Sequence, residues 1–167
     1  YRATIDLDTL SLSDRHDFYQ HPEWMVKYGK KYYYNPGLPE VRTKFNAIIE
    51  ELVQNYQIDA VHFDDYFYPY KIKGEVFNDS VTYKRFGLPN QTLGDWRRSN
   101  VDSLVKNVHG VIKKHKPWVQ FGISPFGVWK NKDTDPQGSD TKAGQTTYED
   151  LYADPLLWTE KGWLDYL

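Results

Sequence analysis

Apolar residues recur at helical spacing in two long stretches of the chain, residues 39–56 and 93–115. In each stretch they fall three or four positions apart, so they line one face of a helix. Pro39 suits a first helical turn, and Thr92 with Asp95 has the pattern of a capping box. The sequence therefore predicts two long amphipathic helices. Two shorter helices are expected over residues 80–86 and 148–162, the second with a restart at Asp154-Pro155.

Short runs rich in β-branched and aromatic residues separate these helices and have the character of strands. The expected strands are Lys31–Tyr34, Ala60–Phe63, Val119–Ile123 and Trp163–Leu167. The order is strand, helix, strand, helix, strand, helix, strand, which favours an α/β fold with parallel strands and crossover helices. Long insertions over residues 66–91 and 124–147 follow two of the strands. Parallel α/β proteins place their sites at such strand ends.

The chain length sets a limit on this fold. A length of 167 residues is enough for one domain with a hydrophobic core, but a complete (β/α)8 TIM barrel needs about 250 residues. Four parallel strands would also leave open sheet edges. We therefore expect residues 1–167 to be one domain, part of a TIM barrel truncated at both ends, which can self-associate through the open edges.

Charge and cysteine content exclude several classes of function. The net charge of -2 gives no sign of a nucleic-acid partner. The absence of cysteine excludes disulfides and thiol-based zinc sites. No run approaches 18 apolar residues, so no membrane span is expected. The one local group of cations, Lys113, Lys114 and Lys116, suits the C-terminus of a helix.

Aromatic residues make up 17% of the chain, and many lie in polar stretches that contain Pro and Gly. Aromatic side chains at a cleft can stack on the flat faces of sugars. They can equally well be packing residues, and composition alone does not distinguish the two.

The segment 58–70, IDAVHFDDYFYPY, carries the candidate chemistry. It begins as a buried strand, in which Val61 and Phe63 share one face while His62 and Asp64 share the other. Asp64 would stand at the C-terminal rim, and Asp65 would point away. Glycoside hydrolysis usually needs two carboxyl groups, and Asp64 suits either role. Both aspartates can instead cap a turn or bind a cation, and His62 can be a core residue.

Further candidates for substrate binding lie at the predicted strand ends and in the insertions: Arg2, Asn35, His62, Tyr66, Tyr68, Ser124, Phe126 and Trp129. Each has a structural alternative. Asn35 can be a turn residue before a Pro-Gly pair, Trp129 can anchor a loop, and Arg2 can pair with Asp64. Asp65 is the only nearby second carboxylate. The true partner of Asp64 can lie on a later strand outside this sequence.

Four linked motifs resemble the bacterial glycosyl-hydrolase-like 10 family. They are VHFDDYFYPY, HPEWMVKYGKKYYYNPGLPEVR at 21–42, FGISPFGVWKN at 121–131 and GSDTKAGQTTYEDLYADPLLWTEKGWLDYL at 138–167. Tyr1-Arg2 is similar to the end of an upstream Asn-Pro-Tyr-Arg motif. The resemblance covers essentially the whole chain. It implies the middle of a glycosidase-like TIM barrel, exported to the periplasm or cell surface or lipid-anchored, that acts on cell-envelope glycans such as peptidoglycan strands.

Residues 59–64 also resemble the Asp-Gly-x-Arg-x-Asp strand of the α-amylase and α-galactosidase group, whose last Asp is the nucleophile. By that resemblance Asp64 is the nucleophile, although Ala60 and His62 depart from the pattern. Three hypotheses follow. The first is a glycosidase that acts through Asp64 without cofactor or metal. The second is a carbohydrate-binding domain whose catalytic site has been lost. The third is a metal-dependent hydrolase, such as a deacetylase, built on His62, Asp64 and Asp65.

Overall fold

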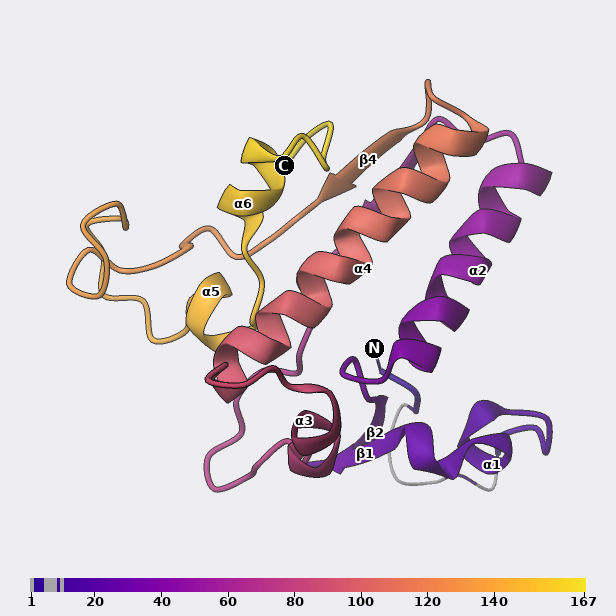
Figure 1. Cartoon of the computed structure of the whole chain (residues 1–167), viewed down its shortest axis with the longest axis horizontal. Coiled ribbons are helices and arrows are strands. Elements are labelled where there is room, and N and C mark those ends of the chain that lie inside the picture. Colours follow the sequence, from indigo (N-terminus) through magenta and orange to yellow (C-terminus); the bar gives the residue numbers. More distant parts are fainter. Residues whose placement is uncertain (1, 5–8, 10) are drawn as a thin grey trace.

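The computed structural model describes residues 2–4, 9 and 11–167, which form a mixed α/β structure (Figure 1). Its elements are α1 (Asp17–Gln20), the 3-10 helix η1 (Pro22–Trp24), β1 (Met25–Tyr28), β2 (Lys31–Tyr34), α2 (Pro39–Asn55), β3 (Ala60–Phe63), α3 (Ser80–Phe86), α4 (Leu93–His115), β4 (Gln120–Ile123), α5 (Thr147–Asp150) and α6 (Pro155–Glu160). The expected mixture of helices and strands is confirmed. Tyr1, part of the predicted Tyr-Arg motif, lies outside the described residues.

The centre of the structure is a parallel β-α-β unit. Strands β3 and β4 pair in parallel, with His62 opposite Gly122, and α4 lies between them in the chain. Helices α2 and α4 pack side by side and run in the same direction (Figure 1). The ring of Phe63 packs against Phe45 of α2 at 5.7 Å and against Phe121 of β4 at 5.1 Å. The helices thus cover one face of the strand pair.

The predicted apolar stripe of the second long helix is confirmed as the core of α4. Its members Val101, Leu104, Val105, Val108 and Ile112 are at most 2% exposed. The ends of the helix follow the sequence as well. The Thr92 hydroxyl accepts a hydrogen bond from the Asp95 backbone N–H, and cationic side chains occupy the last turn.

The first predicted strand does not belong to the parallel sheet. Residues 31–34 form β2, which pairs antiparallel with β1 in a hairpin, Val26 opposite Tyr33. Gly29 begins the two-residue turn with a φ of +57°, a conformation that favours glycine. The expectation of a parallel partner for residues 31–34 was therefore wrong, because a strand-like run does not specify its neighbour.

In the C-terminal part, the helix expected over 148–162 with a restart at Asp154-Pro155 consists of two short helices, α5 and α6. The restart is confirmed, because α6 begins at Pro155 and Asp154 caps it by accepting a hydrogen bond from the Leu157 N–H. The predicted strand 163–167 is reduced to a single parallel bridge between Tyr166 and Gly122 of β4. Two two-stranded sheets result. Of the expected barrel, the described chain shows one β-α-β unit and the start of a third parallel strand.

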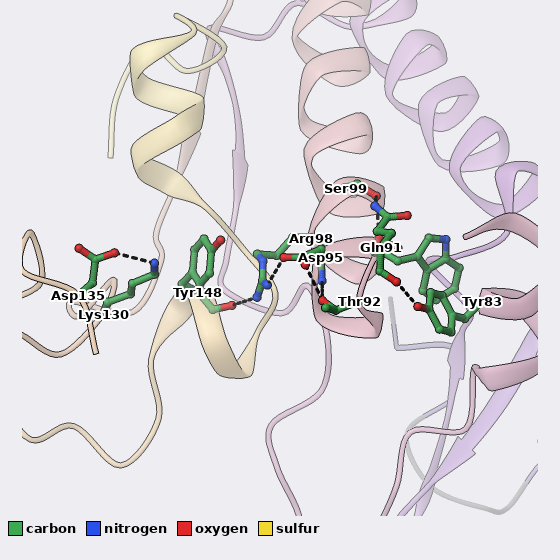
Figure 2. Close-up of polar contacts among 10 residues, drawn as sticks. Tyr83, Gln91, Thr92, Asp95, Arg98, Ser99, Lys130, Asp135 and Tyr148 are labelled. Atoms are coloured by element: carbon green, nitrogen blue, oxygen red, sulfur yellow. Dashed lines mark hydrogen bonds and ion pairs between the residues drawn. The ribbon is translucent and has the colours of Figure 1, made fainter. Parts of the chain in front are cut away.

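The insertion after β4 is closed at its base. The side chain of Asn131 donates a hydrogen bond to the Ala143 carbonyl at 3.0 Å and accepts one from the Ala143 N–H at 2.9 Å. Figure 2 shows Tyr148 between Lys130 and Arg98, whose cationic groups lie 3.9 and 4.1 Å from the centre of its ring. These contacts tie the insertion to the start of α4. Among the described helices, none is long and apolar enough to cross a membrane.

Candidate functional site

The predicted alternation along β3 is confirmed. Val61 is 6% exposed beneath the helices, whereas His62 and Asp64 are exposed. Asp64 follows the last residue of β3 and lines a cavity of about 260 Å³. The other lining residues are Phe45, His62, Phe63, Tyr66, Phe67 and Leu104. No residue in the described part of the chain forms a hydrogen bond or an ion pair with Asp64, so its carboxylate is available to a ligand.

His62 is held at both ring nitrogens by residues of the neighbouring strands. Its Nε2 lies 2.8 Å from the Ser124 hydroxyl, and its Nδ1 lies 3.1 Å from the Tyr166 hydroxyl. The two rings are nearly parallel, with centres 5.7 Å apart. A Cβ at Gly122 would meet the Tyr166 ring at 2.1 Å, so only glycine leaves room for this arrangement. The imidazole is therefore fixed in orientation two residues before Asp64.

Asp65 faces a different set of side chains. Its Oδ2 accepts a hydrogen bond of 2.8 Å from the Tyr70 hydroxyl. Tyr70 stacks on Tyr66 at 5.4 Å and contacts Phe126 at 5.3 Å. Desolvation by burial, and after it the hydrogen bond to Asp65, raises the pKa of Tyr70 above its usual range. Asp65 does not line the Asp64 cavity, in which Asp64 is the only acidic residue among those described.

A larger cavity of about 480 Å³ adjoins the Asp64 cavity, because Tyr66 and Phe67 line both. Its remaining lining residues are Arg2, Lys31, Tyr33, Tyr68, Pro69, Tyr70 and Ile72. Burial raises the pKa of Tyr33, and the positive charge of Arg2 offsets part of that shift. Neither Arg2 nor Lys31 forms an ion pair with another residue that the structure describes. The cavity thus combines a tyrosine wall with two cations.

Two of the predicted binding residues lie away from both cavities. Asn35 is 4% exposed; its side chain accepts a hydrogen bond from the Gly37 N–H and donates one to Thr82. Trp129 is half-buried and donates a hydrogen bond of 3.0 Å to Asp154. Asn35 thus lies in a turn and Trp129 lies at the base of the insertion. These are the positions that their structural alternatives described.

The other predicted residues come together around the end of β3. Asp64, His62, Tyr66, Arg2 and Tyr68 line one or both cavities, and Ser124 contacts His62. Sequence reasoning missed three more residues of this region: Lys31, Tyr70 and Tyr166. The sequence did contain a signal for Tyr166. Side chains alternate between the two faces of a strand, so every second residue of the strand-like run 163–167 can share a face with His62 if the strands are parallel.

His62, Asp64 and Asp65 lie close together in the sequence and have the donor atoms that a metal ion needs. Across residues 2–4, 9 and 11–167, no three His, Asp or Glu side chains are grouped so as to hold one. The proximity of these three residues along the strand does not bring their side chains together, because Asp65 turns toward Tyr70.

Comparison with known proteins gives consistent matches. The sequence profile described as glycosyl hydrolase-like 10 matches residues 2–167. The chain is 50% identical over 169 aligned residues to glycosyl hydrolase YngK of Bacillus subtilis strain 168, covering 100% of the chain and 33% of that protein. It is 42% identical over 159 residues to glycosyl hydrolase DigH of Escherichia coli strain K12, covering 95% of the chain and 36% of that protein. The chain therefore spans about a third of the length of these relatives.

Proposed function

Because the chain belongs to the glycosyl hydrolase-like 10 family, we propose that it supplies part of the active site of a glycosidase, with Asp64 as one of two catalytic carboxylates. The observation that carries this proposal is the position of Asp64. It is an exposed carboxylate at the C-terminal end of a parallel strand, in a cavity, with no partner among the described residues. Barrel enzymes place their catalytic residues at this end of the strands.

Asp64 acts as the nucleophile in this proposal. Its carboxylate attacks the anomeric carbon, the glycosidic bond to the leaving oxygen breaks, and a second carboxylic acid protonates that oxygen. Asp65 is a poor candidate for the acid because Tyr70 occupies its Oδ2 and it does not line the Asp64 cavity. We propose that the acid comes from another strand of a complete TIM barrel, of which this chain is the central part. His62, whose ring nitrogens are engaged by Ser124 and Tyr166, forms part of the cavity wall beside Asp64.

The proposed substrate is a glycan of the bacterial cell envelope, such as a peptidoglycan strand, and the proposed location is outside the cytoplasm, in the periplasm or on the cell surface. Two observations support this substrate: two cations suit acidic substituents, and an aromatic face suits a sugar ring. Arg2 and Lys31 line the cavity next to that of Asp64, and neither has an acidic partner among the residues described. Tyr66, which separates the two cavities, offers an aromatic face to a sugar.

The test uses the full-length protein that carries this segment. It is incubated with purified peptidoglycan glycan strands, with and without stem peptides, and the products are followed by mass spectrometry. Asp64→Asn is expected to lower the rate of cleavage at least about a hundredfold, the usual scale for loss of a catalytic acid or base. Its melting temperature should match that of the parent.

Asp59→Asn is the matched control, because Asp59 is an exposed aspartate before the other end of the same strand. It is expected to cleave at the parent rate. Equal rates for the parent and Asp64→Asn would refute the role of Asp64. Binding without cleavage by either protein would favour the carbohydrate-binding alternative, in which Trp129→Ala rather than Asp64→Asn abolishes function.

A further inference from the structure

We infer that Tyr66 and Tyr70 form a stacking platform for a sugar ring, in a subsite separate from the Asp64 cavity, and that Asp65 is the positioning residue that holds this platform. The inference rests on the proposed function for its ligand class, a glycan strand. It gives Asp65 a role other than catalysis.

The geometry of the platform comes from a short loop after β3. The rings of Tyr66 and Tyr70 have centres 5.4 Å apart and are inclined by only 20°, so they stack on each other and form one aromatic unit. Tyr66 is 60% exposed and Tyr70 is 38% exposed. Phe126, from the insertion after β4, packs against Tyr70 at 5.3 Å. Large aromatic rings exposed to this degree at the mouth of a cavity are available to an incoming ligand.

The cavity beside the platform has the size and chemistry of a sugar subsite. Its volume of about 480 Å³ lies in the range of about 300–1,000 Å³ that is usual for small-ligand sites. Tyrosine hydroxyls and the cations of Arg2 and Lys31 supply polar groups at its rim, and aromatic faces supply the rest. Because Tyr66 also lines the Asp64 cavity, a strand with one residue at Asp64 would lay a neighbouring residue on the platform.

Asp65 fixes the orientation of this surface. Its Oδ2 accepts the 2.8 Å hydrogen bond from the Tyr70 hydroxyl, and it lines neither cavity. A carboxylic acid that gives its proton to a leaving group needs access to the substrate. Asp65 lines neither cavity and its Oδ2 is engaged by Tyr70, so its side chain suits positioning rather than proton donation.

The platform is tested by binding in the Asp64→Asn background of the full-length protein, so that cleavage does not interfere. Isothermal titration with soluble glycan strands from purified peptidoglycan is the measurement. Tyr66→Ala, Tyr70→Phe and Asp65→Ala are each expected to weaken affinity, the last two by about three- to tenfold, the range of one net hydrogen bond. Asp65→Asn should keep most of the affinity, because its amide oxygen still accepts from Tyr70.

Two further readouts separate positioning from other roles. Asp65→Ala combined with Tyr70→Phe should be no weaker than either single variant, because both remove the same bond. With Asp64 intact, Asp65→Ala should raise KM and leave kcat within about twofold. Tyr83→Phe and Asp135→Asn are controls that remove a tyrosine–carbonyl bond and an ion pair, both drawn in Figure 2. Neither residue lines either cavity, so both variants should bind normally.

A hundredfold loss of kcat in Asp65→Asn at unchanged affinity would overturn the inference, because it would make Asp65 the catalytic acid. Additive losses in the double variant would also overturn it, as would full affinity in Tyr66→Ala or no binding by the Asp64→Asn protein. If the parent protein binds but does not cleave, and the platform variants still weaken binding, the proposed hydrolysis fails while the subsite stands.

Discussion

Replacing Asp79 by alanine is expected to destabilise the protein by about 3–5 kcal/mol, the cost of leaving one charge of a buried ion pair without its partner. Asp79 is 1% and Arg97 is 8% exposed at the side chain. The guanidinium donates two hydrogen bonds to this carboxylate, of 2.9 Å from Nε and 2.6 Å from Nη2. It also donates to the Phe77 carbonyl and the Tyr152 hydroxyl, both at 2.9 Å.

The magnitude follows from what remains after the substitution. Arg97 keeps two neutral acceptors and three aromatic rings within 5.9 Å, but no buried negative charge beside it among the described residues. For a chain of this size, the loss corresponds to a fall of about 6–20 °C in melting temperature. Thermal unfolding followed by circular dichroism, with urea unfolding for the free energy, gives both numbers.

Two further variants make the reasoning refutable. Replacing both partners, Asp79→Leu with Arg97→Met, should recover most of the lost stability, because no buried charge is left unpaired. Glu50→Ala removes an exposed carboxylate that contacts His115 at 2.6 Å and Lys114 at 3.7 Å, and it should leave the melting temperature almost unchanged. Two results would refute the reasoning: a loss of unfolding free energy below about 1 kcal/mol in Asp79→Ala, or a double variant that is less stable than Asp79→Ala. Either would show that the unpaired buried charge does not determine the stability of the variant.

Two more stability predictions follow from the structure. Burial raises the pKa of Asp102 to about 6, so folding favours the protonated form of its carboxyl group. The stability that this protonated group gives the fold is lost as the pH rises from about 4 through 6. Asp102→Asn still accepts the hydrogen bond from Trp158, so it should gain stability relative to the parent over that pH range, by at most about 3 kcal/mol. Urea unfolding of both proteins at about pH 4 and about pH 7.5 measures this gain. A difference in unfolding free energy that is the same at both pH values would contradict the prediction. Thr92→Ala removes the cap of α4 (Figure 2) and should cost about 1 kcal/mol at constant pH, whereas Thr92→Ser should cost little.

Helix positions were predictable to within a residue or two because long periodic stretches specify them. The predicted 39–56 and 93–115 became Pro39–Asn55 and Leu93–His115. Strand pairing was not predictable in the same way. The run at 31–34 is a strand, but its partner β1 was missed, because only the turn at Gly29 indicated a hairpin. Periodicity identifies an element, whereas its neighbour is decided by tertiary contacts.

The residues of the candidate site were likewise predictable on the strand and not predictable in the loops. Alternation along a strand correctly separated the buried Val61 from the exposed His62 and Asp64, because it depends only on backbone geometry. Phe63 follows it only in part, because its half-buried ring lines the same cavity as Asp64. The hydrogen bond from Tyr70 to Asp65 lies in a loop without periodicity, and no spacing rule predicts it. Loops place side chains by individual contacts, so their roles become visible only when the contacts are known.

The closed base of the insertion after β4 makes this loop a natural cassette for engineering. The side-chain amide of Asn131 bonds both the N–H and the carbonyl of Ala143. The segment between these two residues can therefore be exchanged or lengthened while both of its ends stay anchored. Loops of equal span could be grafted from other family members without disturbing Phe126 or Ser124, which precede the anchor.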